Sequence, residues 1–227
     1  MLPDMAVLET IEIETGPNPV ACVIVLHGLG ADGNDFVSFT QELDLTAAGP
    51  VRFIFPHAPA IPVTVNDGMR MRAWYDILGR GSGTPEDEAG LRRSLAAVQE
   101  LLAREKERGM APGRTVIAGF SQGCALALLT GLRHPQRLAG IAGLSGYLPL
   151  AQTTGAERAH ANALTPIFMG HGQHDNVVDI GRAEASRDAL RALGYQVEWH
   201  DYPMAHSVSI EEIADLNRWL LNALAKP

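Results

Sequence analysis

One continuously apolar run near the N-terminus, residues 21–27 (ACVIVLH), constrains the fold of this chain more than any other feature. A strand with one face in water alternates apolar and polar residues, whereas a strand buried on both faces is apolar throughout. The run therefore predicts an inner strand of a sheet that is covered by helices on both sides.

Apolar runs and amphipathic stretches alternate along the rest of the chain. Strands are predicted at residues 7–13, 21–27, 51–55, 114–120, 138–144, 166–170 and 195–202. Helices are predicted at residues 34–45, 86–108, 121–133, 184–193 and 208–225. This alternation predicts an α/β fold with a mostly parallel sheet, in a single domain over residues 1–227. Functional groups in such sheets lie just beyond the carboxyl ends of the strands.

Residues 56–85 do not fit the alternation. The segment is rich in proline and glycine, sustains no period, and carries Trp74 and Tyr75. Long irregular segments inside a domain are usually functional or disordered, and the aromatic content argues against disorder. We expect a lid or a pocket wall here.

The strongest chemical signal is Gly119-Phe120-Ser121-Gln122-Gly123, which follows one predicted strand and opens a predicted helix. The G-x-S-x-G pattern is weak alone, but a sharp strand-to-helix turn raises the serine hydroxyl above the sheet as a nucleophile. The alternative is a glycine-rich turn in which Ser121 caps the helix.

A serine nucleophile needs a histidine base and a carboxylate that orients it, in the chain order Ser, Asp or Glu, His. His206 lies between the last strand and the last helix, and is the predicted base. His200 lies within a strand pattern and is interpreted as structural, while His134, at a helix end, can interact with terminal carbonyls.

Asp175, just after the strand at 166–170, is the predicted carboxylate. Asp179 is expected to start or cap the next helix, and Asp201 lies on the wrong side of the turn before the base. The group His171, His174 and Asp175 could also suggest a metal site, but it lies on a loop and no further ligand cluster is evident. We expect no metal and no cofactor.

The oxyanion of an acyl-transfer reaction requires two preorganised donors. We assign them to the backbone N–H groups of Gln122, which follows the nucleophile, and of Leu29, in the glycine-rich run 27–33. That run could instead be a plain turn that caps a helix through Asn34 or Asp35. It contains neither G-x-G-x-x-G nor a phosphate-binding lysine.

The composition excludes several classes of function. The net charge is −8 and no lysine or arginine cluster is present, so nucleic acid is not an expected partner. The first residues are acidic rather than basic and apolar, so no secretory signal is expected, and no run approaches the length of a membrane span. Two scattered cysteines, Cys22 and Cys124, favour a reduced, cytoplasmic setting.

Five segments together resemble the carboxylesterase / acyl-protein thioesterase family of α/β-hydrolases, also described as phospholipase/carboxylesterase. They are HGLGADGNDF, AWYDI, GFSQG, GHGQHDNVV and MAHS, and they extend from about residue 21 to the last helix. The resemblance implies an α/β-hydrolase fold, a cytoplasmic enzyme without cofactors, and often a homodimer. It implies that Ser121, Asp175 and His206 form the triad, that Leu29 and Gln122 supply the oxyanion donors, and that Trp74 lines the acyl pocket.

Cys124 and Asp179 depart from the family pattern. Cys124 stands where many members carry a second glycine, and we expect it to pack, although a nearby helix N-terminus could lower its thiol pKa. Asp179 stands where members often carry proline, which leaves the start of the following helix open.

We therefore expect a serine hydrolase that cleaves carboxylic esters through an acyl-enzyme. A thioesterase or lysophospholipase acting on long-chain substrates would use the same chemistry. A non-catalytic α/β-hydrolase scaffold that binds a ligand is the alternative from another class. The expected substrate is a small-molecule ester or thioester, with no stable membrane insertion.

Overall fold

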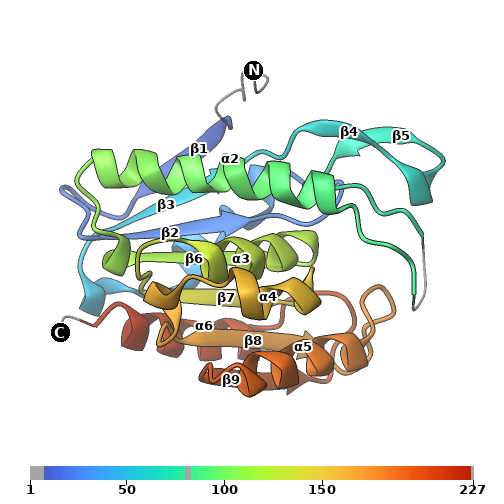
Figure 1. The fold of residues 1–227 in the computed structure, drawn as a ribbon. Coiled ribbons are helices and arrows are strands. Elements are labelled where there is room, and N and C mark those ends of the chain that lie inside the picture. Colours follow the sequence, from blue (N-terminus) through green and yellow to red (C-terminus); the bar gives the residue numbers. More distant parts are fainter. Residues whose placement is uncertain (1–7, 80–82, 226–227) are drawn as a thin grey trace.

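Seven strands form one mixed sheet in the computed structural model, which describes residues 8–79 and 83–225 (Figure 1). Their order is β1-β3-β2-β6-β7-β8-β9. The strands are β1 (Thr10–Glu14), β2 (Ala21–Leu26), β3 (Val51–Pro56), β6 (Thr115–Phe120), β7 (Gly140–Leu144), β8 (Ile167–Gly172) and β9 (Val197–Tyr202). Only the edge strand β1 runs antiparallel to its neighbour. The predicted, mostly parallel sheet is confirmed.

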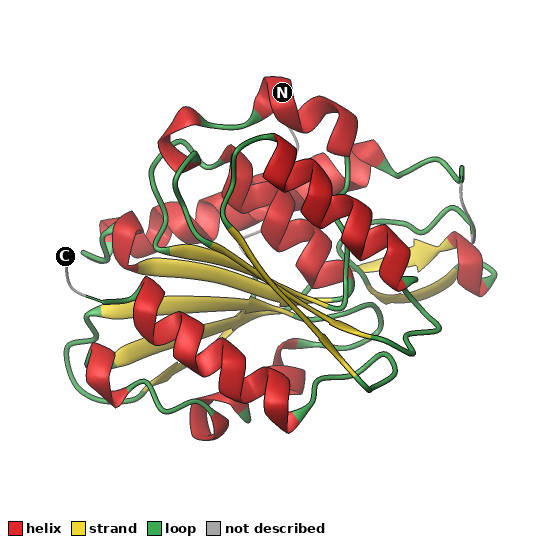
Figure 2. Ribbon diagram, turned by 90° about the horizontal axis from the view of Figure 1, so that it is seen from below, coloured by secondary structure: helices red, strands yellow, loops and turns green. Residues whose placement is uncertain are grey.

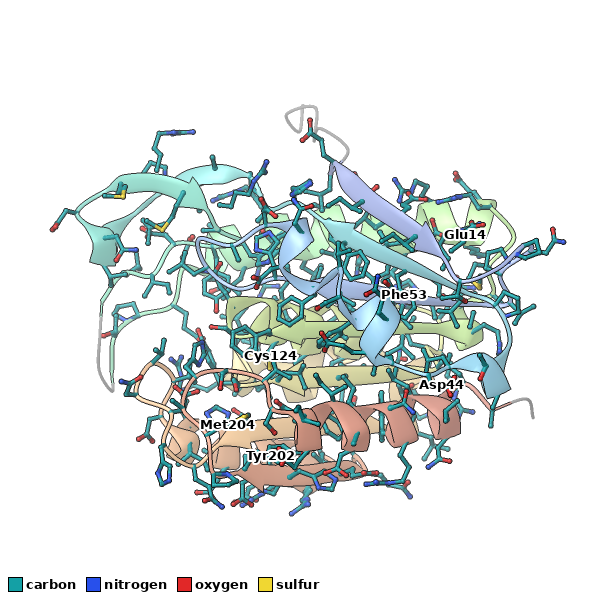
Figure 3. The ribbon with its side chains drawn as sticks, turned by 180° about the vertical axis from the view of Figure 1, so that it is seen from behind. Glu14, Asp44, Phe53, Cys124, Tyr202 and Met204 are labelled. Carbon is teal, nitrogen blue, oxygen red and sulfur yellow. The ribbon has the colours of Figure 1, made fainter. Side chains whose placement is uncertain are left out.

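Helices cover both faces of this sheet, and Figure 2 shows the twisted strands between the two layers. One face carries α2 (Glu88–Glu107), α3 (Gln122–Arg133), α4 (Ala151–Glu157) and α5 (Ile180–Ala192). The other carries α6 (Ile210–Ala223), the one-turn helix α1 (Phe39–Glu42) and the 3-10 helix η1 (Gly33–Phe36), all visible from behind in Figure 3.

The strand β2 explains why the run at 21–27 is apolar throughout. Every residue of β2 is buried, and successive side chains enter opposite layers of the core. Ile24 packs in the core on the α2 and α3 side, whereas Val23 and Val25 pack on the α6 side with Phe53 of β3 (Figure 3). The strand is therefore buried on both faces, as the pattern predicts.

The predicted helix at 34–45 is wrong. The chain forms η1, breaks, and then forms the single turn α1. The carboxylate of Asp32, rather than Asn34 or Asp35, caps the start of η1 by accepting from the N–H of Asn34 at 2.7 Å. Phe36 and Phe39 are still buried, because two short turns bring apolar residues three apart to the same face.

Residues 56–85 are more regular than their composition predicts. They contain a hairpin, β4 (Ala60–Val63) and β5 (Met69–Arg72), whose strands pair antiparallel. It projects beyond the end of the main sheet, at the right of Figure 1. The hairpin was not predicted because its four-residue strands are too short to establish a period. Residues 80–82 of this segment, and Val7 of the first predicted strand, lie outside the described residues.

Two helices on the α2 side also differ from the sequence-based expectation. The helix α4 was not predicted, and α5 begins four residues earlier than expected, at Ile180 rather than residue 184. Asp179 sets that start, since its carboxylate accepts from the N–H of Gly181 at 2.9 Å. The capping role expected of Asp179 is therefore present. No helix in the described part of the chain is long and apolar enough to cross a membrane.

Candidate active site

Ser121 lies at the turn between β6 and α3 with a left-handed backbone, φ 56° and ψ −117°. Such angles are costly for a residue with a side chain and persist only where the surroundings impose them. Two close approaches impose them here. A Cβ on Gly119 would lie 2.2 Å from the Gly123 carbonyl oxygen, and a Cβ on Gly123 would lie 2.1 Å from the Leu26 carbonyl oxygen. The two glycines of the motif therefore permit the sharp turn.

The hydroxyl of Ser121 does not cap α3. Its side chain makes no hydrogen bond to the helix, and its Oγ lies 2.9 Å from Nε2 of His206. Nδ1 of the same imidazole lies 2.7 Å from Oδ2 of Asp175. The structure thus brings the three residues assigned to the triad into one chain of hydrogen bonds.

Asp175 occupies the loop after β8, and its side chain is fully buried. Its second oxygen, Oδ1, accepts from the N–H groups of Val177 at 2.8 Å and Val178 at 2.9 Å. These bonds fix the carboxylate and compensate the burial of a charge. Asp201, the competitor, is exposed and accepts from the Gln173 side chain at 2.6 Å. It is not part of this network.

The two competing histidines lie elsewhere. His200 is within β9, where its Nε2 lies 3.0 Å from Glu198, as its structural interpretation requires. His134 ends α3, but both of its ring nitrogens are buried without a partner among the described residues, so the expected contact with terminal carbonyls is absent. Burial lowers the pKa of His134.

A second histidine, His171, supports the loop that carries Asp175. It is fully buried, and its Nε2 lies 2.9 Å from the Val178 carbonyl oxygen and 3.3 Å from Oδ2 of Asp175. Its ring stacks on Trp199 of β9. With Nε2 protonated, the imidazole donates to Val178 and closes the loop around the carboxylate. The sequence analysis considered His171 as a metal ligand and did not predict a metal, and no spacing pattern signals the loop-closing contact.

The proposed oxyanion donors come from two different loops. Leu29 follows β2, and its loop turns at Gly30, which has φ +77° and donates to the Arg72 carbonyl at 2.8 Å. Gln122 is the first residue of α3, where the dipole favours negative charge. Among the described residues, neither backbone N–H donates to another group of the protein. Both remain free to donate to a substrate.

The side chain of Gln122 performs a structural task that the sequence does not reveal. Its Oε1 accepts from the backbone N–H of Trp74 at 2.8 Å, and its Nε2 donates to the Tyr75 carbonyl at 2.7 Å. Gln122 is 3% exposed, so these bonds satisfy groups that water does not reach. The strand-to-helix turn at residues 119–123, called the elbow below, is thereby joined to the segment 56–85.

Trp74 also joins the segment 56–85 to the glycine-rich run 27–33, which carries Leu29 and is called the oxyanion loop below. Its indole Nε1 donates to the His27 carbonyl at 2.9 Å, and its own carbonyl accepts from the Ser94 hydroxyl. His27 in turn accepts from the N–H of Ala58 at 3.0 Å through Nε2, and burial lowers the pKa of this histidine. Residues of the segment 56–85 therefore hydrogen-bond to both parts of the chain that carry the proposed oxyanion donors, the oxyanion loop and the start of α3.

Cys124 packs beneath the elbow as expected, but the possible lowering of its pKa is wrong. The thiol is fully buried, and burial raises its pKa despite the nearby helix N-terminus. The packing around it is close, because a Cβ on Gly146 would lie 2.5 Å from the Cys124 Cβ, so position 146 requires glycine. Cys22 is also buried and unpaired.

Within residues 8–79 and 83–225, the structure contains no group of three or more side chains placed to hold a metal ion. His174 is exposed, while His171 and Asp175 are engaged in the contacts described above.

The fold and the geometry around Ser121 together identify the class of protein. A mostly parallel sheet between helices, a serine at a strained strand-to-helix turn, and a later aspartate and histidine are the features of an α/β-hydrolase. The model of the phospholipase/carboxylesterase family matches residues 8–223. The chain belongs to this family and is a hydrolase of carboxylic esters.

Individual relatives agree with this assignment. The chain is 39% identical to acyl-protein thioesterase 1 of Yarrowia lipolytica over 88% of its own length and 90% of that protein. It is 41% identical to acyl-protein thioesterase 1 of Neurospora crassa, over 91% and 88% of the two chains. The crystal structure of acyl-protein thioesterase 2 of Zea mays superposes with a TM-score of 0.84 at 29% identity, over 96% of this chain and 100% of the other.

Proposed function

We propose that the protein hydrolyses carboxylic esters through an acyl-enzyme formed on Ser121, with His206 as base and Asp175 as the residue that orients the base. The observation that carries the proposal is the continuous contact from Ser121 Oγ to His206 Nε2 at 2.9 Å and from His206 Nδ1 to Asp175 at 2.7 Å. A serine hydroxyl is a poor nucleophile at neutral pH, and this arrangement is what activates it.

In the first step, Nε2 of His206 takes the proton of Ser121 as Oγ attacks the substrate carbonyl carbon. The carbonyl oxygen becomes an oxyanion, which accepts from the N–H groups of Leu29 and Gln122. The bond to the leaving oxygen or sulfur then breaks, and His206 donates the proton to the departing group. The products are an alcohol or thiol and an acyl ester of Ser121.

In the second step, water attacks the acyl carbon while His206 takes one of its protons. The same donors hold the second oxyanion, Ser121 leaves with the proton from His206, and the free acid is released. Asp175 remains ionised throughout, since its task is to hold the tautomer in which Nδ1 carries the proton.

The segment 56–85 forms, on this proposal, a wall of the acyl pocket. Trp74, which is 2% exposed, supports this wall from within the core, because its indole Nε1 donates to the His27 carbonyl at 2.9 Å. The whole chain acts as one domain on a small-molecule substrate, without nucleic acid, cofactor or stable membrane insertion. A cytoplasmic location, which rests on the resemblance and on the unpaired cysteines, and a homodimer, which rests on the resemblance alone, complete the proposal.

A second candidate function is hydrolysis of long-chain acyl thioesters or lysophospholipids. The relatives favour the thioesterase form, because those at 39% and 41% identity are acyl-protein thioesterases. The same residues would carry out the same steps, with a thiol as the leaving group.

A chain-length series of p-nitrophenyl esters, assayed beside a palmitoyl thioester, separates the two candidates. A maximum of kcat/KM at short acyl chains supports the carboxylesterase. A maximum at long chains, with faster cleavage of the palmitoyl thioester, supports the thioesterase. A non-catalytic binding scaffold would cleave neither, and its Ser121 would not react with a fluorophosphonate.

A further inference from the structure

A groove of about 330 Å³ opens beside His206. It lies on the face of the sheet that carries η1, α1 and α6, and Figure 3 shows the molecule from this side. Its lining comes from η1, α1, the end of β6, the loop after β9 and α6, all on this face. Half of the lining side chains are apolar, namely Phe36, Phe39, Phe120, Val208 and Ile213, and the others are polar, namely Asp35, Ser38, Glu42, His206 and Ser207. The proposed mechanism does not use it, and the volume is that of a small-molecule pocket.

The aromatic wall is continuous from the imidazole outward. The Phe120 ring centroid lies 4.8 Å from that of His206, and Phe36 lies 5.7 Å from Phe120. Phe39 meets Phe36 edge to face at 4.9 Å. Phe36 and Phe39 are 8% and 3% exposed, so these two rings support the groove from beneath, and Phe120 is the ring next to His206.

The rim of the groove is negatively charged. Asp35 and Glu42 lie on its rim, and both residues are exposed. Among the described residues that line the groove there is no lysine or arginine. Two exposed carboxylates on the rim, with no positive side chain among the described lining residues, attract a cation.

The side of the triad on which the groove opens indicates which part of a substrate it meets. The lining includes His206 but not Ser121, Leu29 or Gln122, so the groove adjoins the proposed base and not the proposed oxyanion donors. The carbonyl oxygen of the substrate faces those two N–H groups, whereas the leaving atom must accept the proton of His206. The leaving group is therefore the part of the substrate that lies nearest to the groove.

We propose that this groove binds the leaving alcohol or thiol of the substrate and favours one that carries a positive charge. The inference rests on the proposed function and adds to it the chemistry of the leaving group. It concerns Asp35 and Glu42, which the acyl-transfer steps do not involve.

Two thioesters with the same acyl group test the inference. Butyrylthiocholine and S-(3,3-dimethylbutyl) thiobutyrate differ in one atom, because the quaternary nitrogen of the first is a carbon in the second. Hydrolysis of either releases one thiol, which a thiol reagent detects, and both cysteines of the protein are buried. The measured quantity is the ratio of kcat/KM for the cationic over the neutral substrate.

The proposal predicts a ratio of about fivefold at low ionic strength, which falls toward one at about 1 M NaCl as the exposed carboxylates are screened. In the double variant Asp35→Asn, Glu42→Gln the ratio should fall below about twofold. The matched control is Glu100→Gln, Glu107→Gln. It removes two exposed carboxylates from α2, on the opposite face of the sheet, and should retain the wild-type rates and ratio.

A wild-type ratio near one would overturn the inference. So would a ratio that the groove variant leaves unchanged, or that the control lowers equally, because the preference would then come from the overall negative charge. Failure of the proposed function gives a different result, since neither thioester would then be hydrolysed.

Discussion

Nδ1 of His206 lies 2.7 Å from Oδ2 of Asp175, and this contact joins two loops that are 31 residues apart in the chain. The loops follow β8 and β9, which are neighbours in the sheet. The register of two parallel strands therefore determines whether the base and its orienting carboxylate meet. The sheet also places Ser121 opposite them, because its N–H donates to Leu144 at the end of β7 at 2.8 Å.

Replacement of Asp175 by asparagine should lower kcat by about 10³- to 10⁴-fold, because an amide can bind the imidazole in the wrong tautomer. KM should change little and the protein should remain folded. Asp201→Asn is the matched control, since that carboxylate is exposed and bonds only the Gln173 side chain among the described residues. Steady-state kinetics on one ester check both variants, and near-normal turnover by Asp175→Asn would refute the assignment.

His171→Phe should lower kcat by about tenfold while KM stays near its wild-type value. Phenylalanine keeps the stacking on Trp199 but removes the Nε2 contacts with Val178 and Asp175, so the carboxylate loses part of its orientation. The acid limb of the pH profile of kcat/KM should shift as well.

His171→Gln is the companion variant, because its amide can restore a donor near Val178. It should recover much of the lost kcat and return the pH profile toward that of the wild type. Equal losses in the two variants, with unchanged pH profiles, would mean that His171 acts only through packing.

Gln122→Met should lower the free energy of unfolding by about 2–4 kcal/mol, because it leaves the buried Trp74 N–H and Tyr75 carbonyl without partners. Urea unfolding measures the loss. Gln41→Met, at an exposed position, is the control and should change stability by less than about 0.5 kcal/mol. Similar stabilities of the two variants would show that the bridge from the elbow to 56–85 contributes little.

Glu212 is a buried carboxyl of α6, and both of its oxygens lack a partner among the described residues. Burial raises its pKa from 4.5 to about 8, with a further increase from Asp215. Between these two values the unfolded chain has lost the proton that the folded chain keeps. The stability contributed by the neutral carboxyl is therefore complete below about pH 4.5 and lost as the pH rises through 8.

Glu212→Gln tests this pH dependence. The variant should be close to the wild type in stability at pH 4, and more stable by roughly 3–5 kcal/mol at pH 9. Urea unfolding at a series of pH values measures the difference. Parallel stability curves for the two proteins would contradict the raised pKa.

The sequence predicts the parts of the site that follow long, regular elements. Ser121 and Asp175 follow the buried strands β6 and β8, so the apolar runs locate them before any contact is known. His206 follows the edge strand β9, which is only partly buried, and is located by its place between the last strand and the last helix. The alternation of these runs with helices is also sufficient to predict a mostly parallel sheet. Burial on both faces leaves a short, continuous apolar run in each inner strand, and the amphipathic helices between the runs indicate the α/β arrangement.

The supporting contacts could not be predicted in the same way. The bridge from Gln122 to Trp74 and Tyr75 joins residues 48 and 47 positions apart, and depends on a hairpin whose strands are four residues long. The position of η1 depends on the close approach of Gly33 to β3, where a Cβ on Gly33 would lie 2.5 Å from the Phe55 carbonyl oxygen. Both outcomes are decided by tertiary contacts.

Intact-protein mass spectrometry after treatment with a fluorophosphonate tests most directly whether Ser121 is the nucleophile. A nucleophilic Ser121 gives one adduct per folded chain, located by peptide mapping on Ser121 and absent from Ser121→Ala. A folded wild-type protein that stays unlabelled, or a Ser121→Ala variant that is still labelled, would contradict this assignment.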